Sequence, residues 1–386
     1  MKQFYPLSTF LTEYSEKNGV NAYRPVAVGR YGIRTRESIY SKELAKDYSK
    51  NKLIHKNTLT VGMGSVQIDI GVLTDDITYS VSPAYHTYKI AGVNAEYLRY
   101  CLECRNQDMF SRFVKRGSRQ GKTIDLKRWM TYEIPVYDEN RQQEIVDRLN
   151  RISELIEKRQ EQLVQLSELV KSRFIELFGD SEFNTMQCPT EKLSELCVVS
   201  SSKRIYQNEQ STEGVPFLRI SDLNERIDNV KNAPELFIPI NKYNELKENG
   251  LVPTEGDILV TSRGTLGRCY IVRPEDEFYF QDGMISWLSD LSHQITSLYL
   301  SQLFAMSGIQ KQIASLQAGS TVAYLSISML KKLDIMLPPL NLQNQFAVFV
   351  EQTDKSKYYS SLSFRYCQAA ANTYRQEWMT CRTSDF

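Results

Sequence analysis

Residues 133–146 read Glu-Ile-Pro-Val-Tyr-Asp-Glu-Asn-Arg-Gln-Gln-Glu-Ile-Val, and residues 334–347 read Asp-Ile-Met-Leu-Pro-Pro-Leu-Asn-Leu-Gln-Asn-Gln-Phe-Ala. In both places a short apolar stretch reaches proline, and a glutamine-rich segment then opens a long helical pattern. The correspondence continues upstream: residues 57–65 align with 257–265, and 96–98 align with 298–300. The chain therefore contains an internal repeat, and we expect two similar globular units, each followed by a long helix.

The two helical segments carry matching apolar stripes. Residues 140–178 place apolar side chains at alternating steps of three and four, interrupted at Arg159, and residues 341–378 repeat the stripe with Thr353 and Lys357 in its middle. We expect the helices to pair antiparallel as a coiled coil, and the alternative is that each packs only on its own domain. The expected pairing residues are Ile145, Leu149, Ile152, Ile156, Leu163, Val170, Phe346, Val350, Phe364 and Ala371.

The expected fold class is α+β, with two similar α/β domains separated by two long antiparallel helices in a pseudo-twofold repeat. Short apolar runs at residues 23–28 and 59–61 indicate strands, and residues 94–113 indicate one helix. The predicted domains are residues 1–138 and 181–338 for the globular units, 139–180 for the central helix, and 339–386 for the C-terminal helix and tail.

Composition indicates a protein of the cytoplasm without a membrane span. Apolar residues make up 41% of 386, no run approaches the 18 or so that a span needs, and the amino terminus lacks the apolar core of a secretory signal. Seven scattered cysteines, an odd number, indicate reduced thiols.

The net charge of +1 hides an asymmetry between the halves. Residues 1–178 hold 28 Lys plus Arg against 22 Asp plus Glu, and the remainder holds 19 against 24, which together give the totals of 47 and 46. A near-neutral chain is unlike a non-specific DNA-coating protein, which is strongly basic. Local positive charge in the first half remains compatible with DNA reading.

Residues 112–123 form the strongest local signal, Arg-Phe-Val-Lys-Arg-Gly-Ser-Arg-Gln-Gly-Lys-Thr. Glycine lets the backbone approach a ligand, Arg and Lys contact phosphates or guanine edges, and Ser and Gln add neutral hydrogen bonds. The pattern therefore favours DNA contact over a merely solvated loop. Its counterpart at residues 316–325 keeps glycine and hydroxyls without the charge.

Residues 261–268, Thr-Ser-Arg-Gly-Thr-Leu-Gly-Arg, look like a phosphate loop but lack its Gly-Lys-Ser/Thr ending, so we reject nucleotide binding and expect a tight β-turn that displays arginine. Residues 62–67 occupy the same place in the first unit. The predicted DNA-binding residues are Arg30, Arg34, Arg36, Ser65, Gln67, Lys115, Arg116, Ser118, Arg119, Gln120, Lys122, Lys203, Arg204, Arg219, Arg263, Thr265, Arg268, Ser320 and Thr321.

No motif predicts catalysis, a metal site or a bound cofactor. Cys101 and Cys104 have the spacing of a metal knuckle, but no second pair or nearby histidine completes four ligands, and their helical context predicts buried thiols. The three histidines form no recognisable set with an acid and a nucleophile. Neither a dinucleotide fingerprint nor the Asp/Asn-Pro-Pro-aromatic motif of amino-methyltransferases is present.

The two globular units, the two similar helices and the proline-to-glutamine junctions resemble the specificity (S) subunit of Type I restriction–modification systems. Residues 117–124 and 256–260 also look like target-recognition domains of that family. The resemblance covers nearly the whole chain. The polar middle of the second helix departs from a fully apolar stripe.

The resemblance implies that each unit reads one half of a bipartite sequence in double-stranded DNA. It implies that the helices set the spacing and dock two modification (M) subunits, which methylate adenine with S-adenosylmethionine. Restriction (R) subunits, which use ATP and magnesium, join to translocate and cleave. This chain itself would be non-catalytic. The alternatives are a scaffold that binds only proteins and an independent enzyme with an unrecognised site.

Overall fold

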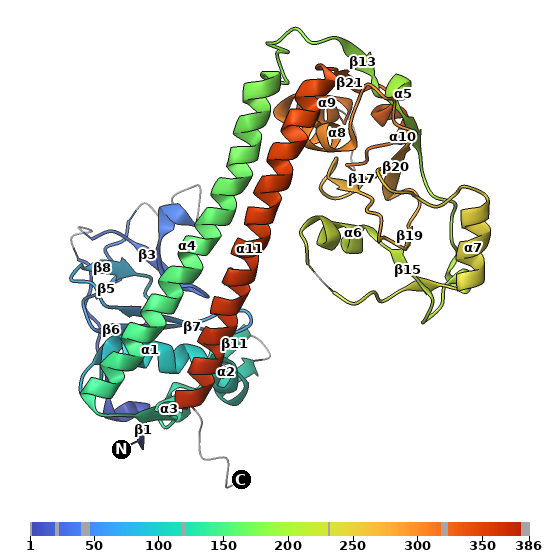
Figure 1. The fold of residues 1–386 in the computed structure, drawn as a ribbon. Coiled ribbons are helices and arrows are strands. Elements are labelled where there is room, and N and C mark those ends of the chain that lie inside the picture. The colour runs from blue at the N-terminus through green and yellow to red at the C-terminus, as the bar shows by residue number, and fades with distance from the viewer. Residues whose placement is uncertain are drawn as a thin grey trace. The chain divides into compact units, whose positions relative to one another are not determined.

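The computed structural model describes residues 2–19, 23–39, 47–117, 121–230, 232–317 and 323–379, without the side chains of Arg116 and Gly117. The chain divides into two compact units, Met1–Gln160 with Leu362–Phe386, and Glu161–Ser361. Each unit thus contains part of both long helices, which are the green and red ribbons of Figure 1.

The first unit is built on a four-stranded antiparallel sheet. Its strands lie in the order β2 (Leu11–Glu13), β9 (His86–Ile90), β6 (Thr58–Met63) and β7 (Ile68–Leu73). Four further pairs are β1 (Gln3–Pro6) with β12 (Glu133–Val136), β3 (Val26–Gly29) with β4 (Gly32–Thr35), β5 (Lys52–Ile54) with β8 (Tyr79–Val81), and β10 (Val114–Gly117) with β11 (Gly121–Ile124). The helices are α1 (Ala95–Cys104), α2 (Asn106–Phe113) and α3 (Leu126–Trp129), with short 3-10 turns at Leu7–Thr9 and Arg36–Ser38.

The second unit repeats this plan. Its four-stranded sheet has the order β14 (Val198–Ser200), β20 (Ile285–Ser289), β17 (Ile258–Thr261) and β18 (Cys269–Ile271), and β13 (Thr190–Lys192) pairs with β21 (Asp334–Met336). Helices α8 (Ser297–Phe304), α9 (Ser307–Leu316) and α10 (Ile327–Leu330) follow in the same order as α1, α2 and α3. The internal repeat predicted from the sequence is therefore confirmed in the four-stranded sheet, in the β1–β12 and β13–β21 pairs and in the helices that follow.

The units differ in their inserts. The second has a three-stranded sheet of β16 (Phe237–Ile238), β15 (Val215–Leu218) and β19 (Tyr279–Phe280), together with α6 (Ile220–Ile227), α7 (Ile240–Glu248) and a 3-10 turn at Gln207–Glu209, whereas α5 (Leu193–Leu196) takes the place of the Leu7–Thr9 turn of the first unit. The first unit has the β3–β4 and β5–β8 pairs between corresponding sheet strands instead. The shared sheet and helices are thus a common frame that carries different inserts.

The long helices are α4 (Glu139–Phe178) and α11 (Leu340–Met379), and they pair antiparallel, as predicted. In the first unit, the start of α4 packs through Leu149 against Tyr374 and Trp378, near the end of α11. In the second unit, Phe174, near the end of α4, lies 5.5 Å from Phe346, near the start of α11. Both helices also pack on the globular cores, so each domain holds part of the long-helix pair.

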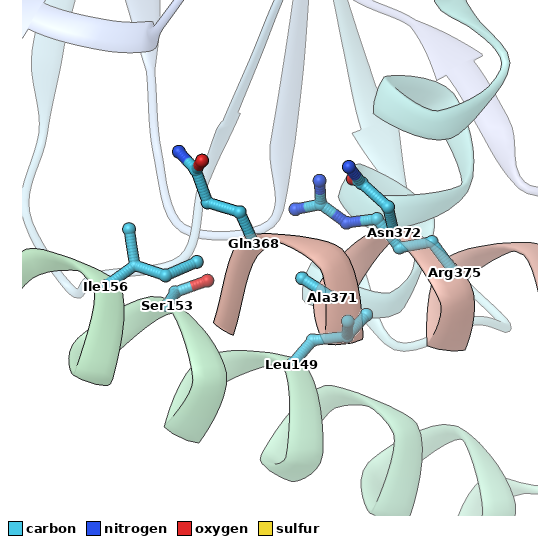
Figure 2. Close-up of a pocket in the computed structure, with 7 residues that line it drawn as sticks. All are labelled: Leu149, Ser153, Ile156, Gln368, Ala371, Asn372 and Arg375. Carbon is cyan, nitrogen blue, oxygen red and sulfur yellow. The ribbon is translucent and has the colours of Figure 1, made fainter. Parts of the chain in front are cut away.

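Six of the ten predicted pairing residues are buried, namely Ile145, Leu149, Val170, Phe346, Val350 and Ala371. The other four, Ile152, Ile156, Leu163 and Phe364, are only partly covered. In the first unit a cavity of about 320 Å³ opens between the helices, lined by Leu149, Ser153 and Ile156 from α4 and by residues of α11 that include Ala371 (Figure 2). Small side chains at Ser153 and Ala371 leave this stretch of the helix pair incompletely filled.

The helices and thiols of the first unit differ in part from the sequence prediction. The helix expected over residues 94–113 is broken at Arg105, whose φ of −104° and ψ of 6° end α1. The break has a local cause, because the Asn106 amide hydrogen-bonds both the N–H and the C=O of Ile68 and so fixes the start of α2 on strand β7. Cys101 is a buried thiol of α1, as expected from its helical context, whereas Cys104, also expected to be buried, is only partly buried.

A buried glutamine joins each long helix to its globular unit. Gln142 Oε1 accepts a hydrogen bond from the Asn94 N–H at 2.9 Å, and its Nε2 donates to the Tyr137 carbonyl. Gln343 does the same with the Thr296 N–H at 2.9 Å, and its Nε2 donates to the carbonyls of Gln294 and Pro338. Asn94 and Thr296 are the N-caps of α1 and α8, so the two glutamines make one repeated contact.

A tyrosine closes the same junction in both units. Tyr97 O–H donates to the carbonyl of Pro135 at 2.7 Å, and Tyr299 O–H donates to that of Met336 at 3.1 Å. Both rings are fully buried, and burial raises the pKa of both phenols. The neutral hydroxyl is therefore a donor to the strand that precedes each long helix. Among the described residues, no helix combines the length and the apolar character that crossing a membrane requires.

We predict that Gln343→Ala lowers the free energy of unfolding by on the order of 3 kcal/mol, because one N–H and two carbonyls lose their partner in a buried place. Urea unfolding of the full chain measures this. The matched control is Gln345→Ala, two positions along the same helix and exposed, which should change stability by less than about 0.5 kcal/mol. Equal effects of the two substitutions would contradict a structural role for Gln343.

Candidate nucleic-acid interface

In the first unit, the β6–β7 turn and the β10–β11 hairpin form one surface, which we call the turn–hairpin surface (residues 64–67, 114–117 and 121–124). Lys122 Nζ donates a hydrogen bond to the Ser65 carbonyl and lies 5.3 Å from the centroid of the Phe110 ring. Gln107 Nε2 donates to the Val66 carbonyl at 3.4 Å. The predicted residues Ser65, Gln67 and Lys122 are therefore brought together on this surface.

Lys115 adds a second cation to the turn–hairpin surface. It faces Thr123 across the hairpin, its side chain is 65% exposed, and its Nζ lies 2.8 Å from Asp125 Oδ2. The hydrogen bond from Lys115 is the main cause that lowers the pKa of Asp125, so the carboxylate stays charged. Because exposed ion pairs contribute little stability, Lys115 can exchange this partner for a phosphate at small cost.

Several predicted residues lie outside the described part of the chain. They are Ser118, Arg119 and Gln120, between β10 and β11 in the sequence, Ser320 and Thr321 in the second half of the chain, and the side chain of Arg116. Their assignment to DNA contact stays a prediction.

The three arginines close together in sequence lie at two different ends of strand β7. Arg30 and Arg34 flank the exposed Tyr31 ring, at 5.7 and 4.5 Å from its centroid, and Tyr31 lines a hollow beside Asp75, beyond the end of β7. Arg36 instead lines a hollow with residues at the opposite end of β7, next to the β6–β7 turn. Only Arg36 therefore lies beside the turn–hairpin surface.

Most predicted arginines of the second unit are bound to acids. Arg204 pairs with Asp282 at 2.8 Å, and Arg219 pairs with Asp222 at 3.2 Å and with Glu235 at 2.7 Å. Arg268 pairs with Asp228 and donates to Asn224 at 2.8 Å. The excess of acidic residues in the second half thus includes acids that pair with, and neutralise, its candidate DNA-binding arginines. Lys203 is exposed, and its peptide N–H donates to the Tyr279 hydroxyl.

The prediction of a tight β-turn directly after β17 is wrong. Residues 262–268 make a longer connection in which Arg263 forms a β-bridge with Tyr324, 4.8 Å from that ring. Thr265 is exposed at the tip, and its carbonyl accepts a hydrogen bond from Thr261 Oγ1 at 2.5 Å. Arg263 therefore lies against Tyr324 of its own unit, whereas the prediction had Arg263 and Arg268 displayed outward on a tight turn.

One histidine has partners that the sequence did not indicate. His55 Nδ1 lies 3.0 Å from Thr78 Oγ1, and its Nε2 lies 3.1 Å from Glu16 Oε2. The order hydroxyl, imidazole and carboxylate is that of a hydrolase triad, but a triad's acid is buried, whereas the Glu16 side chain is 56% exposed. Among the described residues, no group of three or more His, Cys, Asp and Glu side chains could hold a metal ion.

Two candidate side chains were missed by the sequence analysis. Tyr31 is 68% exposed at the tip of the β3–β4 hairpin, and Asp69 lies opposite Gly62 next to the β6–β7 turn. The Gly-Arg-Tyr-Gly sequence of residues 29–32 was a readable signal for the hairpin tip. Asp69 had no such signal, because a single acid within a strand pattern is ordinary.

A family model decides the affiliation of this two-unit chain. The model described as Type I restriction modification DNA specificity domain matches residues 11–166 and 189–358, which is one match per unit. The chain belongs to this family. It is thus one of the specificity (S) subunits of Type I restriction–modification systems.

Individual relatives agree with the family. The S subunit is 28% identical over 164 residues to a putative type I restriction enzyme specificity subunit of Haemophilus influenzae, S.HindORF215P. That match covers 42% of this chain and 39% of the relative, so it spans well under half of the curated protein.

Solved structures share the fold over nearly the whole chain. The S subunit of a Type I restriction–modification system from M. genitalium aligns with a TM-score of 0.57 and 15% identity, over 99% of this chain and 97% of that one. A chain from work described as the structural basis underlying complex assembly and conformational transition of the type I R-M system aligns with a TM-score of 0.50 and 13% identity, over 98% and 97%. At such identities these likenesses concern the fold.

We predict that Lys122→Ala weakens duplex DNA binding by the 386-residue chain and lowers the slope of log affinity against log salt by about 0.9, the loss of one phosphate contact. Fluorescence anisotropy at several salt concentrations measures both quantities. Lys158→Ala, which removes an exposed lysine of α4, is the charge-matched control and should leave the slope unchanged. Identical slopes for wild type and Lys122→Ala would remove Lys122 from the interface.

Proposed function

We propose that this S subunit is the sequence-specific DNA-binding component of a Type I restriction–modification complex. Each globular unit reads one half of a bipartite target in double-stranded DNA. The helices set the spacing between the halves and dock two methyltransferase (M) subunits, and the complex then directs adenine methylation and restriction in the cytoplasm. The observation that carries the proposal is the duplicated sheet-and-helix frame, because two equivalent frames with different inserts suit two half-sites of different sequence.

The different arrangement of cations in the two units supports different specificities for the two halves. The first unit offers the exposed Lys115 and the Lys122–Ser65 contact on its turn–hairpin surface. The second unit offers arginines that are held by acids, such as Arg204 and Arg268. Phosphate contacts position a protein on DNA, and base contacts select the sequence. We therefore assign more of the phosphate anchoring to the first unit.

The long helices support the spacing role. Each has 40 residues, which corresponds to roughly 60 Å of helix. Exposed apolar side chains along them, such as Val164 on α4 and Tyr359 and Tyr366 on α11, are suitable for partner subunits. In this proposal the chain holds no cofactor, and S-adenosylmethionine, ATP and magnesium are used by the M and restriction (R) subunits.

Mapping methylated adenines in the host genome, with and without the gene for this chain, tests the proposed function. We expect one bipartite motif to lose methylation when the gene is deleted, and footprinting of an M-containing complex to protect that motif. A scaffold that binds only proteins would protect no defined sequence. That result would reject DNA reading by this chain.

A triple variant tests the basic hairpin as the phosphate anchor. We predict that Lys115→Ala, Arg116→Ala and Arg119→Ala together weaken DNA binding and reduce the salt slope by up to about 2.7, since each phosphate contact contributes about 0.9. Titration of labelled duplex at several salt concentrations measures the slope. Unchanged affinity and an unchanged slope would refute the assignment of this hairpin.

The isolated chain should show no turnover. Incubation with target DNA, S-adenosylmethionine and magnesium, followed by detection of methylated and cleaved DNA, makes the test. Any activity that appears should be compared with Thr78→Ala, which removes the hydroxyl beside His55. Robust activity in the wild type and its loss in Thr78→Ala would instead support an independent enzyme.

A further inference from the structure

A polar hollow lies beside the turn–hairpin surface of the first unit. Strands β3, β6 and β7 and the loop that follows β8 enclose a cavity of about 370 Å³, and its lining includes Arg36, Gly62, Met63, Asp69 and Tyr85. Gly62 and Met63 end strand β6 and lead directly into the turn of Ser65 that Lys122 contacts. The hollow and the basic hairpin therefore share one turn.

Asp69 supplies the acceptor of this hollow. It stands in β7 directly opposite Gly62, and among the described residues its carboxylate has no hydrogen-bond donor, burial being the sole influence on its ionisation. The side chain is partly buried, and this desolvation raises its pKa. A partly buried carboxylate without a hydrogen-bond donor raises the free energy of the unbound protein. A donor group on a ligand would remove that cost.

Arg36 supplies the donor. Its guanidinium lies 5.2 Å from the centroid of the Tyr48 ring, which orients it, and its Nε is buried without a partner among the described residues. No ion pair joins Arg36 to Asp69 within the described structure, although both line the same hollow. The hollow thus presents a donor and an acceptor that do not satisfy each other.

Two glycines and a fixed tyrosine keep the hollow open. A Cβ atom on Gly62 would lie 2.4 Å from the Tyr85 ring, and one on Gly64 would lie 2.6 Å from Asp69 Oδ1. The Tyr85 hydroxyl donates to the Val28 carbonyl at 2.9 Å, so the ring has a defined position against strand β3. The shape of the hollow is therefore set before any ligand arrives, which favours selective binding.

We propose that the Asp69 hollow is a specificity site that reads one amino-bearing base of the DNA half-site bound by the first unit. Asp69 accepts a hydrogen bond from the exocyclic amino group of a cytosine or an adenine, and Arg36 donates to an acceptor of the same base pair. Carboxylates suit the cytosine amino group and arginine suits guanine O6 and N7, so a C·G pair satisfies both side chains. This inference rests on the proposed function.

The test is a double-mutant cycle that combines Asp69→Ala in the protein with removal of one amino group from a base of the DNA. A library of targets varied at every position first shows where Asp69→Ala changes base preference, and that base is then replaced by an analogue without its amino group. For wild type, removal of the amino group should weaken binding roughly 5- to 150-fold, the range of one good base contact. For Asp69→Ala the same removal should cost almost nothing.

Controls separate the outcomes. Asp76→Ala removes an exposed acid from a loop of the same unit and should keep the wild-type preference at every position. If Asp69→Ala does not fold, as judged by its thermal unfolding, Arg36→Gln takes its place and should weaken selection at the same base pair only. A wild-type complex that binds a bipartite sequence, combined with unchanged preference in the variants, overturns this inference alone, whereas a wild type with no sequence preference overturns the proposed function.

Discussion

The buried glutamine at the start of each long helix is the contact on which the two-unit architecture depends. A glutamine side chain carries an acceptor and a donor on one rigid amide, so Gln343 can bind the N-cap peptide of α8, the Gln294 carbonyl of the loop before it and the Pro338 carbonyl at once. Gln142 occupies the same place in the first unit, where it contacts the N-cap peptide of α1. The direction of each long helix is thereby linked to the sheet of its own domain, and the link is specific because an unpaired amide in this place is costly.

The repeat could be predicted because its key residues recur in one order at one spacing. The proline-to-glutamine junctions and the tyrosines of α1 and α8 are readable in the sequence, and the structure gives them equivalent hydrogen bonds. The packing at the end of α4 could not be read in the same way. A stripe of threes and fours includes Val170 and Phe174, but it does not reveal that Phe174 and Phe178 pack on the core around Tyr299 as well as on α11.

The residue types of the candidate site could be predicted from the sequence, but most of the contacts between these residues could not. Charge and glycine content identified the hairpin of Lys115 and Lys122, since both features are local in sequence. Neutralisation of Arg204 by Asp282 and of Arg268 by Asp228 joins residues far apart in the chain, so no local pattern revealed it. Asp69 is a candidate only because folding places it in one hollow with Arg36 and leaves the Asp69 carboxylate and the Arg36 Nε without hydrogen-bond partners among the described residues.

The antiparallel helix pair also constrains synthesis. The core of the first unit includes Tyr374, Trp378 and Met379, and Arg105 of that unit donates to the Met379 carbonyl at 2.6 Å. During translation the amino-terminal domain therefore emerges from the ribosome with part of its apolar surface uncovered, and it stays so until the whole second domain has been made. Such a nascent chain exposes this apolar surface for longer than an amino-terminal domain that folds as soon as it is made, so it needs protection by a chaperone. A product that terminates before α11 would leave the first domain open to aggregation, although the rest of that domain has been made.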